Sequence, residues 1–250
     1  MSILTRLSGS HATAAYAPAV AEARSYRQHR FSAPPGAAEL LLVRHGESEV
    51  AVEGRSFELV DGHGDPALSP EGRIQASKVC ARLSGEHIDA IYVSTLRRTA
   101  ETAADLAHSL GITPVVEPDL REVFLGEWEG GTFRQKVADG DPIAQRMYLD
   151  ERWDVIPGAE PAEDFAARTR GVVERIAGAH PDQRVAVFAH GGIIGQILAM
   201  ATGSRPFALA GADNASISHL VVIDDRWVLR RFNDTTHLDP TLTIRPAPLT

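Results

Sequence analysis

Short apolar runs and longer amphipathic stretches alternate along the chain from residue 39 onward. The short runs are rich in β-branched residues and are bounded by turn-forming residues, which predicts strands. These strands are expected at 39–43, 88–93, 113–116, 184–189, 217–223 and 227–232. The last two flank Asp224-Asp225-Arg226, a short connection that is typical of an antiparallel hairpin.

Helical periodicity fills most of the stretches between these strands. Ser69-Pro70-Glu71 is a helix start, and Ile74, Val79 and Leu83 follow it at near-helical spacing, which predicts a helix. Further helices are expected at 98–110, 134–148, 161–179 and 191–201, the last apolar on nearly all sides and therefore buried. This alternation predicts an α/β fold, a three-layer α/β/α sandwich with a mostly parallel central sheet.

Composition and charge narrow the class of protein. The chain has 250 residues, is 44% hydrophobic and carries a net charge of −8, so it can bury a large core and lacks the basic footprint of a nucleic-acid or membrane-surface binder. The single cysteine, Cys80, excludes an intramolecular disulfide and is expected to be a core thiol. No apolar run reaches membrane-spanning length, and we expect a cytoplasmic protein. The sequence does not reveal the oligomeric state, so a homodimer is one possibility.

Residues 1–38 differ from the rest of the chain. They hold four arginines and one glutamate, are rich in Ala, Ser and Pro, and end near Pro34-Pro35-Gly36. This composition predicts a poorly ordered extension and linker that precedes a domain at 39–250. A basic targeting arm is the open alternative.

Candidate chemistry begins where the first strand ends. The run Leu40–Val43 leads directly into Arg44-His45-Gly46-Glu47, so an imidazole and a guanidinium stand together at the carboxyl end of a strand. Ligands of open α/β sheets bind at these ends. A neutral imidazole can attack phosphorus and a guanidinium can grip phosphate oxygens, which suggests phosphoryl chemistry.

Three further groups fall at the ends of other predicted strands. His190-Gly191-Gly192 joins the strand 184–189 to a helix whose free N–H groups would attract an anion, Arg98 lies in the first turn of the helix after Val93, and Glu122 follows the strand 113–116. If each residue is considered alone, the better interpretation of His190 is a core histidine, that of Arg98 is half of a surface ion pair, and that of Glu122 is a solvated loop carboxylate. Their shared position predicts a cationic phosphate site with a proton donor at its rim.

These residues also carry a resemblance to a known family. Four motifs resemble, in order and spacing, those of the histidine phosphatase superfamily, the phosphoglycerate mutase-like branch 1 group. They are Arg44–Ser48, Leu96–Ala103, Leu120–Glu122 followed by Gly126…Gly130, and His190-Gly191. The likeness covers about residues 39–238 and implies a phosphoglycerate mutase-like fold, an insertion at about 126–160, and catalysis without a metal or other cofactor.

The resemblance also implies roles. His45 matches the nucleophile that becomes phosphorylated, and Glu122 matches the general acid. The residues expected to bind the phosphate are Arg44, Arg98, His190, Ser48 and Gly191. For His45 to attack, its reacting nitrogen must be neutral, and we expect its other nitrogen to donate to a backbone carbonyl.

Two departures from the family pattern bear on the substrate. Members with mutase activity carry an asparagine where this chain has Ala51, and they carry a longer insertion after the general acid. Both departures favour a phosphomonoester hydrolase that acts on a small phosphorylated metabolite. A phosphoglycerate mutase-type phosphotransferase and a catalytically silent phospho-ligand-binding protein remain the alternatives.

A substrate-side wall is expected around the phosphate site. Its candidate residues are Phe124, Trp128, Trp153 and His63. Core aromatics and a loop histidine are an equally good interpretation of these four side chains.

Overall fold

The computed structural model describes residues 25–241. Residues cluster into two units, 1–32 and 33–250. Residues 25–37 form neither helix nor strand and are mostly exposed. The rest of the predicted extension, residues 1–24, lies outside the described residues, so its expected poor order and the targeting-arm alternative stay predictions.

Six strands form the central sheet, in the order β5-β4-β6-β1-β7-β8. Strands β5, β4, β6 and β1 are parallel, whereas β7 pairs antiparallel with both β1 and β8. Their bounds are β1 Ala38–Arg44, β4 Ala90–Val93, β5 Val115–Val116, β6 Arg184–Ala189, β7 Ile217–Ile223 and β8 Arg226–Asp234. The mostly parallel sheet and the terminal hairpin predicted from the sequence are therefore confirmed.

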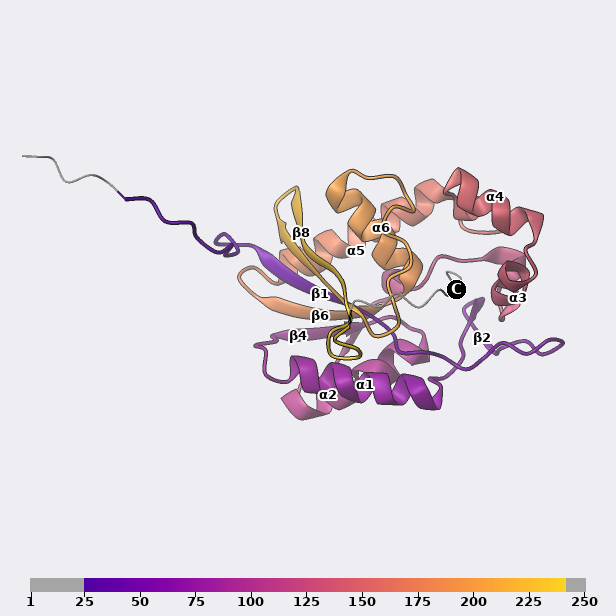
Figure 1. Cartoon of the computed structure of the whole chain (residues 1–250), viewed down its shortest axis with the longest axis horizontal. Helices are drawn as coiled ribbons and strands as arrows, with labels where there is room; N and C mark the ends of the chain where they lie inside the picture. The colour runs from indigo at the N-terminus through magenta and orange to yellow at the C-terminus, as the bar shows by residue number, and fades with distance from the viewer. Residues whose placement is uncertain (1–24, 242–250) are drawn as a thin grey trace, which may run out of the picture. The chain divides into compact units, whose positions relative to one another are not determined.

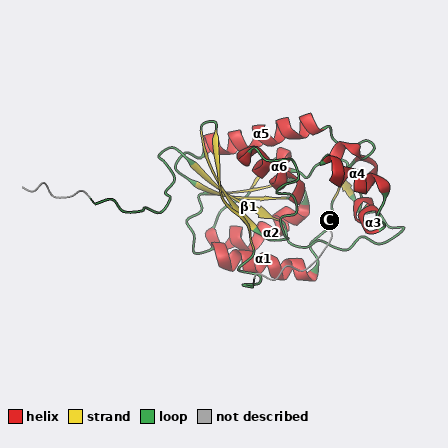
Figure 2. Cartoon of the chain, turned by 45° about the horizontal axis from the view of Figure 1, so that its top comes forward, coloured by secondary structure: helices red, strands yellow, loops and turns green. Residues whose placement is uncertain are grey.

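Helices cover both faces of this sheet (Figures 1 and 2). On one face lie α1 (Pro70–Leu83) and α2 (Arg97–Leu110), and on the other lie α5 (Ala162–Ala179) and α6 (Gly191–Thr202). Each face has its own apolar core, in which Phe188 points to the α1–α2 side and Val187 to the α5–α6 side. This arrangement is the expected three-layer sandwich.

Helix α1 begins as the sequence predicts, but one of its apolar residues faces outward. The Ser69 hydroxyl accepts a hydrogen bond from the N–H of Gly72 at 3.0 Å, and Pro70 occupies the first turn. Val79 and Leu83 are buried, whereas Ile74, which shares their near-helical spacing, is 53% exposed. Cys80 is partly buried against the α1–α2 core.

The insertion contains two short helices, α3 (Thr132–Ala138) and α4 (Pro142–Asp150), where one helix at 134–148 was expected. The chain breaks because Gly140 has a φ of +67° and Asp141 caps α4, its carboxylate accepting from the N–H of Ile143 at 2.8 Å. Short 3₁₀ turns lie at Pro118–Leu120, Gly126–Trp128 and Trp153–Val155.

A two-stranded hairpin, β2 (Leu59–Val60) and β3 (His63–Gly64), was not expected. Its turn residues Asp61 and Gly62 both have positive φ angles, 49° and 83°, as a type I′ turn requires. The hairpin follows the His45 loop and delivers His63 and Gly64 to the site described below. No helix between residues 25 and 241 has the length and apolar character needed to cross a membrane.

Candidate active site

The predicted site residues meet at the carboxyl ends of the parallel strands. In the sheet register Arg44 lies beside Ala189, and Val93 lies beside Phe188, so the residues that follow β1, β4 and β6 emerge at one edge. The rings of His45 and His190 are 5.1 Å apart between centroids. The prediction that these residues lie at the carboxyl-terminal edge of the parallel strands therefore agrees with the sheet register.

His45 is held in one tautomer. Its Nδ1 lies 2.7 Å from the carbonyl oxygen of Gly46, which can only accept, so Nδ1 carries the proton and Nε2 carries the free electron pair. Burial, followed by the positive charges of Arg98 and Arg44, holds the pKa of His45 well below its usual value. The ring is therefore neutral and nucleophilic at Nε2.

The loop that carries His45 is pressed against the start of α1. A Cβ at Gly46 would lie 2.6 Å from the carbonyl oxygen of Gly72, and a Cβ at Gly72 would overlap the carbonyl of Glu47. The N–H of Gly46 also donates to the Thr102 hydroxyl at 3.0 Å. Close backbone contact, which only glycine allows here, fixes the loop between α1 and α2.

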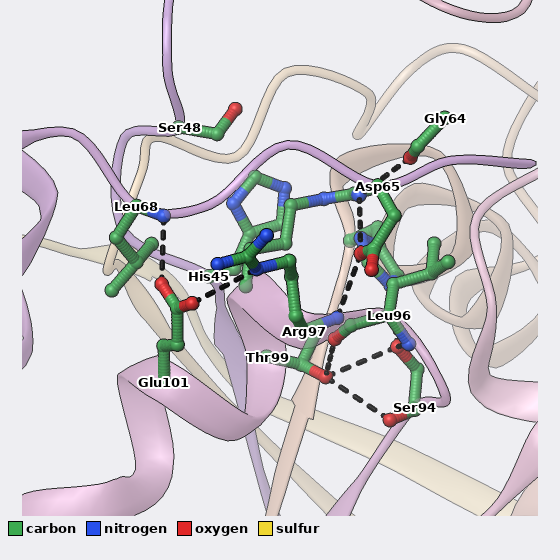
Figure 3. A network of polar contacts seen from close by, with 12 residues as sticks. His45, Ser48, Gly64, Asp65, Leu68, Ser94, Leu96, Arg97, Thr99 and Glu101 are labelled. Carbon is green, nitrogen blue, oxygen red and sulfur yellow. Dashed lines mark hydrogen bonds and ion pairs between the residues drawn. The ribbon is translucent and has the colours of Figure 1, made fainter. Parts of the chain in front are cut away.

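His190 is also buried and neutral, and a hydroxyl network orients its ring. Its Nε2 lies 2.8 Å from the Ser94 hydroxyl. That hydroxyl in turn lies 3.1 Å from the hydroxyl of Thr99, and Figure 3 shows this Ser94–Thr99 contact. Burial and the charge of Arg98 hold the pKa of His190 well below its usual value. When Ser94 donates to Nε2, the other ring nitrogen carries the proton and can donate to a phosphate oxygen.

Two arginines bring positive charge to the two imidazoles. Arg98 is only 8% exposed and donates to the carbonyl of Gly64 at 2.9 Å, while Arg44 donates to the carbonyl of Ala212 at 2.6 Å. Burial lowers the pKa of Arg98 to about 10, so this guanidinium stays charged at neutral pH, and burial also lowers the pKa of Arg44. The Arg44 guanidinium also lies against Gly191, where a Cβ would be 3.4 Å from it.

Arg97, the other half of the doubled arginine, faces away from this centre. Its Nε donates to the Glu101 carboxylate at 3.1 Å, and Glu101 also accepts from the N–H of Leu68 (Figure 3). Its side chain is half exposed. The structure therefore keeps Arg97 apart from the phosphate-site residues.

Glu122 occupies the N-terminus of α6. Its carboxylate accepts hydrogen bonds from the N–H groups of Gly192 at 2.9 Å, Ile193 at 3.0 Å and Val123 at 2.9 Å. Two of the N–H groups that were expected to be free at this helix start therefore bind a carboxylate from a segment distant in sequence. The helix start thereby fixes Glu122 near Arg44. Burial lowers the pKa of Arg44, and the negative charge of Glu122 opposes this effect by raising it.

A second group that the sequence did not reveal orients the Glu122 segment. Arg168, on α5, forms a two-pronged ion pair with Glu160, at 2.7 and 2.8 Å. The same guanidinium donates to the carbonyl oxygens of Asp119, Arg121 and Glu122, each at 2.9 Å. One arginine therefore binds the backbone of the segment that carries Glu122.

Arg134 is a further residue near the site that the sequence did not predict. It comes from α3 in the insertion, and its guanidinium donates to the Ser48 hydroxyl at 2.7 Å and to the carbonyl of Glu49 at 2.8 Å. Ser48 is buried beside the His45 loop. No sequence motif marked Arg134, since its role depends on the path of the insertion.

The four expected substrate-side residues divide into two pairs. His63 and Phe124 lie together, with ring centroids 5.3 Å apart, and the charge of His63 acts on His190. Trp128 is buried in a separate apolar cluster with Met147. Trp153 packs against the same cluster and lies 4.9 Å from the ring of Phe207.

The arrangement can perform phosphoryl transfer. A nucleophilic nitrogen, two guanidinium groups, a potential imidazole donor and a carboxylate lie at one sheet edge, and such preorganised cations stabilise the charge of a phosphoryl transition state. Between residues 25 and 241, His, Cys, Asp and Glu side chains form no group of three that could hold a metal ion.

Comparison with known proteins places the chain in a family. Residues 40–235 match the model of the histidine phosphatase superfamily (branch 1). A phosphoglycerate mutase-like protein 4 of Arabidopsis thaliana is 34% identical, over 82% of this chain and 88% of its own. Phosphoserine phosphatase 1 of Hydrogenobacter thermophilus is 32% identical, over 80% of this chain and 94% of its own length.

A solved structure shows the same likeness. The native structure of a mycobacterial glucosyl-3-phosphoglycerate phosphatase superposes with a TM-score of 0.64 and is 31% identical. The match covers 80% of this chain and 100% of the other. The similarity therefore extends across the sheet and the site edge.

Proposed function

The chain belongs to the histidine phosphatase superfamily (branch 1), and we propose that it is a metal-independent phosphomonoester hydrolase acting on a small phosphorylated metabolite. The observation that carries the proposal is the neutral ring of His45. Its Nδ1–H donates to the carbonyl oxygen of Gly46, which leaves the electron pair of Nε2 available for attack close to the cations Arg98 and Arg44. The phosphatase names of two relatives support hydrolysis as the reaction.

In the first step, Nε2 of His45 attacks phosphorus and the ester P–O bond breaks, so that the electron pair leaves with the alcohol oxygen. Arg44, Arg98 and His190 bind the phosphoryl oxygens. Glu122 gives the leaving oxygen its proton.

In the second step, the Glu122 carboxylate accepts a proton from water, and the water oxygen attacks phosphorus. The N–P bond breaks, its electron pair returns to Nε2 of His45, and inorganic phosphate leaves. The ring regains its neutral state without a metal ion. Ser48 and the N–H of Gly191, both at this edge, are proposed to add hydrogen bonds to the phosphate.

The relatives suggest which esters to try first. Phosphoserine and a glycosylated phosphoglycerate, the substrates that their names give, each carry a carboxylate close to the phosphate ester. His63 and Phe124 are proposed to contact the rest of the substrate, because their rings lie together and His63 acts electrostatically on His190. A cytoplasmic location remains an expectation from the sequence, which has a single cysteine and no apolar run of membrane-spanning length.

Phosphate release tests the proposal. Purified enzyme is assayed with a panel of small phosphate esters, including O-phosphoserine and 3-phosphoglycerate, with and without EDTA. Release should persist with EDTA and vanish in His45→Ala, whereas His87→Ala, which removes an 87% exposed ring, should keep it. Equal release by wild type and His45→Ala would refute a phosphatase, and an isomerised ester with little free phosphate would indicate a mutase instead.

A further inference from the structure

The peptide group that joins His45 to Gly46 is hydrogen-bonded at both of its polar atoms. Its carbonyl oxygen, on His45, accepts from the side-chain amide of Asn214 at 3.0 Å and from the backbone N–H of Ala215 at 3.2 Å. Its N–H, on Gly46, donates to the Thr102 hydroxyl at 3.0 Å. The C=O and N–H of a trans peptide point in opposite directions, so Asn214 and Thr102 hold this peptide from opposite sides.

The orientation of this peptide decides where the carbonyl of Gly46 points. That carbonyl lies 2.7 Å from Nδ1 of His45 and keeps the proton on this nitrogen. A glycine backbone has wide conformational freedom, so a loosened peptide would let the Gly46 carbonyl turn away from the ring. Contact with Gly72 leaves no room for a side chain at position 46, whereas the hydrogen bonds set the plane of the peptide. The tautomer of His45 therefore depends on groups that do not touch its ring.

Thr102 reaches the peptide from α2 and is held in place by the helix. Its hydroxyl donates to the carbonyl of Arg98, one turn earlier, at 2.6 Å, while its oxygen accepts from Gly46. Both Thr102 and Gly46 are buried. A valine would fill the space of the threonine but leave the N–H of Gly46 buried without a partner, which is unfavourable.

The loop that carries Asn214 is anchored by the C-terminal part of the described chain. Ala215 has a φ of 59°, which is uncommon for alanine and persists only where the surroundings hold it. Its carbonyl accepts from Nε2 of His237 at 3.0 Å. Asp213 exchanges two hydrogen bonds with Asn233, at 2.7 and 2.8 Å. The Asn214 amide is therefore presented to the nucleophile by a loop that is fixed on both sides.

We propose that Asn214 and Thr102 are positioning residues, which orient Nε2 of His45 through the peptide between His45 and Gly46. This inference rests on the proposed function, in which His45 is the nucleophile, and extends it to two residues outside the set assigned to the phosphate. Attack requires the electron pair of Nε2 to point at phosphorus in line with the ester bond, and small displacements of a reacting atom cost large factors in rate. Phosphate binding by the two arginines and the second histidine does not require this alignment.

Two substitutions loosen the peptide from its two sides. Thr102→Val should slow phosphorylation of the enzyme by an aryl phosphate about tenfold to a hundredfold, as measured by rapid mixing. Asn214→Ala should slow it less, about threefold to tenfold, because the N–H of Ala215 still holds the same carbonyl. In both variants the inhibition constant of orthovanadate, an analogue of the transferred phosphoryl group, should change less than about twofold, because the cations that bind it stay in place.

Nitrogen-15 NMR of the imidazole rings gives a readout that does not depend on activity. The chain has ten histidines, and the spectrum of His45→Gln identifies the signals of His45. Wild type should show a protonated Nδ1 and an unprotonated Nε2 in this ring. In Thr102→Val and Asn214→Ala the two nitrogen signals should move towards a common shift, because the proton then exchanges between both positions.

Matched controls separate positioning from folding. Thr169→Val also removes a buried hydroxyl from a helix, but that hydroxyl has no hydrogen-bond partner among the described residues. It should leave the phosphorylation rate and the His45 signals unchanged. Thr102→Ser keeps the hydroxyl and should restore most of the rate. Denaturant unfolding of each variant reports its stability separately.

The possible outcomes are distinct. Slower phosphorylation with shifted His45 signals and nearly normal vanadate inhibition supports the proposal. Wild-type His45 signals in both variants, or a loss of vanadate affinity as large as the loss of rate, would overturn it while the phosphatase stands. If wild type forms no phosphoenzyme, the proposed function itself fails, and the spectra still decide whether the two residues fix the ring.

Discussion

The carboxylate of Glu122 and the backbone of Gly192 are in direct contact, with Oε2 accepting the Gly192 N–H at 2.9 Å. The contact requires a glycine, since a Cβ at position 192 would overlap the other carboxylate oxygen. The start of α6 and the proposed general acid are thus one structural unit.

Gly192→Ala should push the Glu122 carboxylate off the helix start. We expect kcat to fall about tenfold or more for esters with poor leaving groups, because proton delivery contributes on this scale. Gly178→Ala is the matched control, since Gly178 lies in α5 with open space around its Cβ position. That variant should keep full activity and gain about 0.5–1 kcal/mol in unfolding free energy. Equal activity in the two variants would contradict the contact's role.

Glu122→Gln should discriminate between leaving groups. The amide keeps the shape of the side chain but cannot donate a carboxylic proton, so alkyl phosphates should slow about a hundredfold or more. Aryl phosphates, whose phenolate leaves with little help, should show a much smaller loss in the phosphorylation step. Rapid-mixing assays that resolve this step measure the ratio, and equal losses on both ester classes would rule out the general-acid assignment.

Arg168→Lys should disturb the Glu122 segment without removing charge. Lysine cannot reproduce the two-pronged pair with Glu160 together with three backbone hydrogen bonds. We expect a loss of about 1–3 kcal/mol in unfolding free energy, the usual cost of leaving a buried hydrogen-bond acceptor without its partner. The fall in kcat should again be larger for alkyl than for aryl phosphates. Exposed Arg170→Lys, on the same helix, is the control.

The buried histidines should make stability depend on pH. The pKa values of His45 and His190 lie well below 6.5 in the folded state, chiefly because of burial. As the pH falls through about 6.5, the unfolded chain therefore binds protons that the folded chain does not, and the unfolding free energy falls. Each histidine contributes up to about 1.4 kcal/mol per pH unit.

His190→Gln tests this dependence. Denaturant unfolding between pH 6.5 and about 5 should give a shallower decline than wild type, by about 1 kcal/mol per pH unit. His87→Gln, which removes an exposed ring, should keep the wild-type slope. Parallel curves for wild type and His190→Gln would show that the ring takes up its proton equally in both states.

The strand ends and their residues were predictable, and long-range contacts were not. The apolar run before Arg44 fixes β1, and parallel strands bring their carboxyl ends to one edge, so His45, Arg98 and His190 could be placed together from sequence. The contact of Glu122 with α6 has no local signal, because it joins positions 70 residues apart. Arg134 and Arg168 were missed for the same reason.

Some local features were missed although a signal existed. Asp61-Gly62 is a hairpin-turn dipeptide, but β2 and β3 are only two residues long and β2 is exposed, so no strand pattern flanks it. Asp141-Pro142 marks the start of α4, and with Gly140 before it could have divided the expected helix. Ile74 shows that spacing alone does not decide burial, since tertiary packing does.

The most direct measurement is to trap and map the phosphorylated enzyme. Wild type, His45→Ala and Glu122→Gln are mixed with a radiolabelled aryl phosphate and quenched in alkali, in which phosphohistidine survives. The label should map to His45, be absent from His45→Ala, and accumulate in Glu122→Gln because water attack is slowed. A label on another residue, or turnover in His45→Ala at the wild-type rate, would contradict the phosphohistidine mechanism.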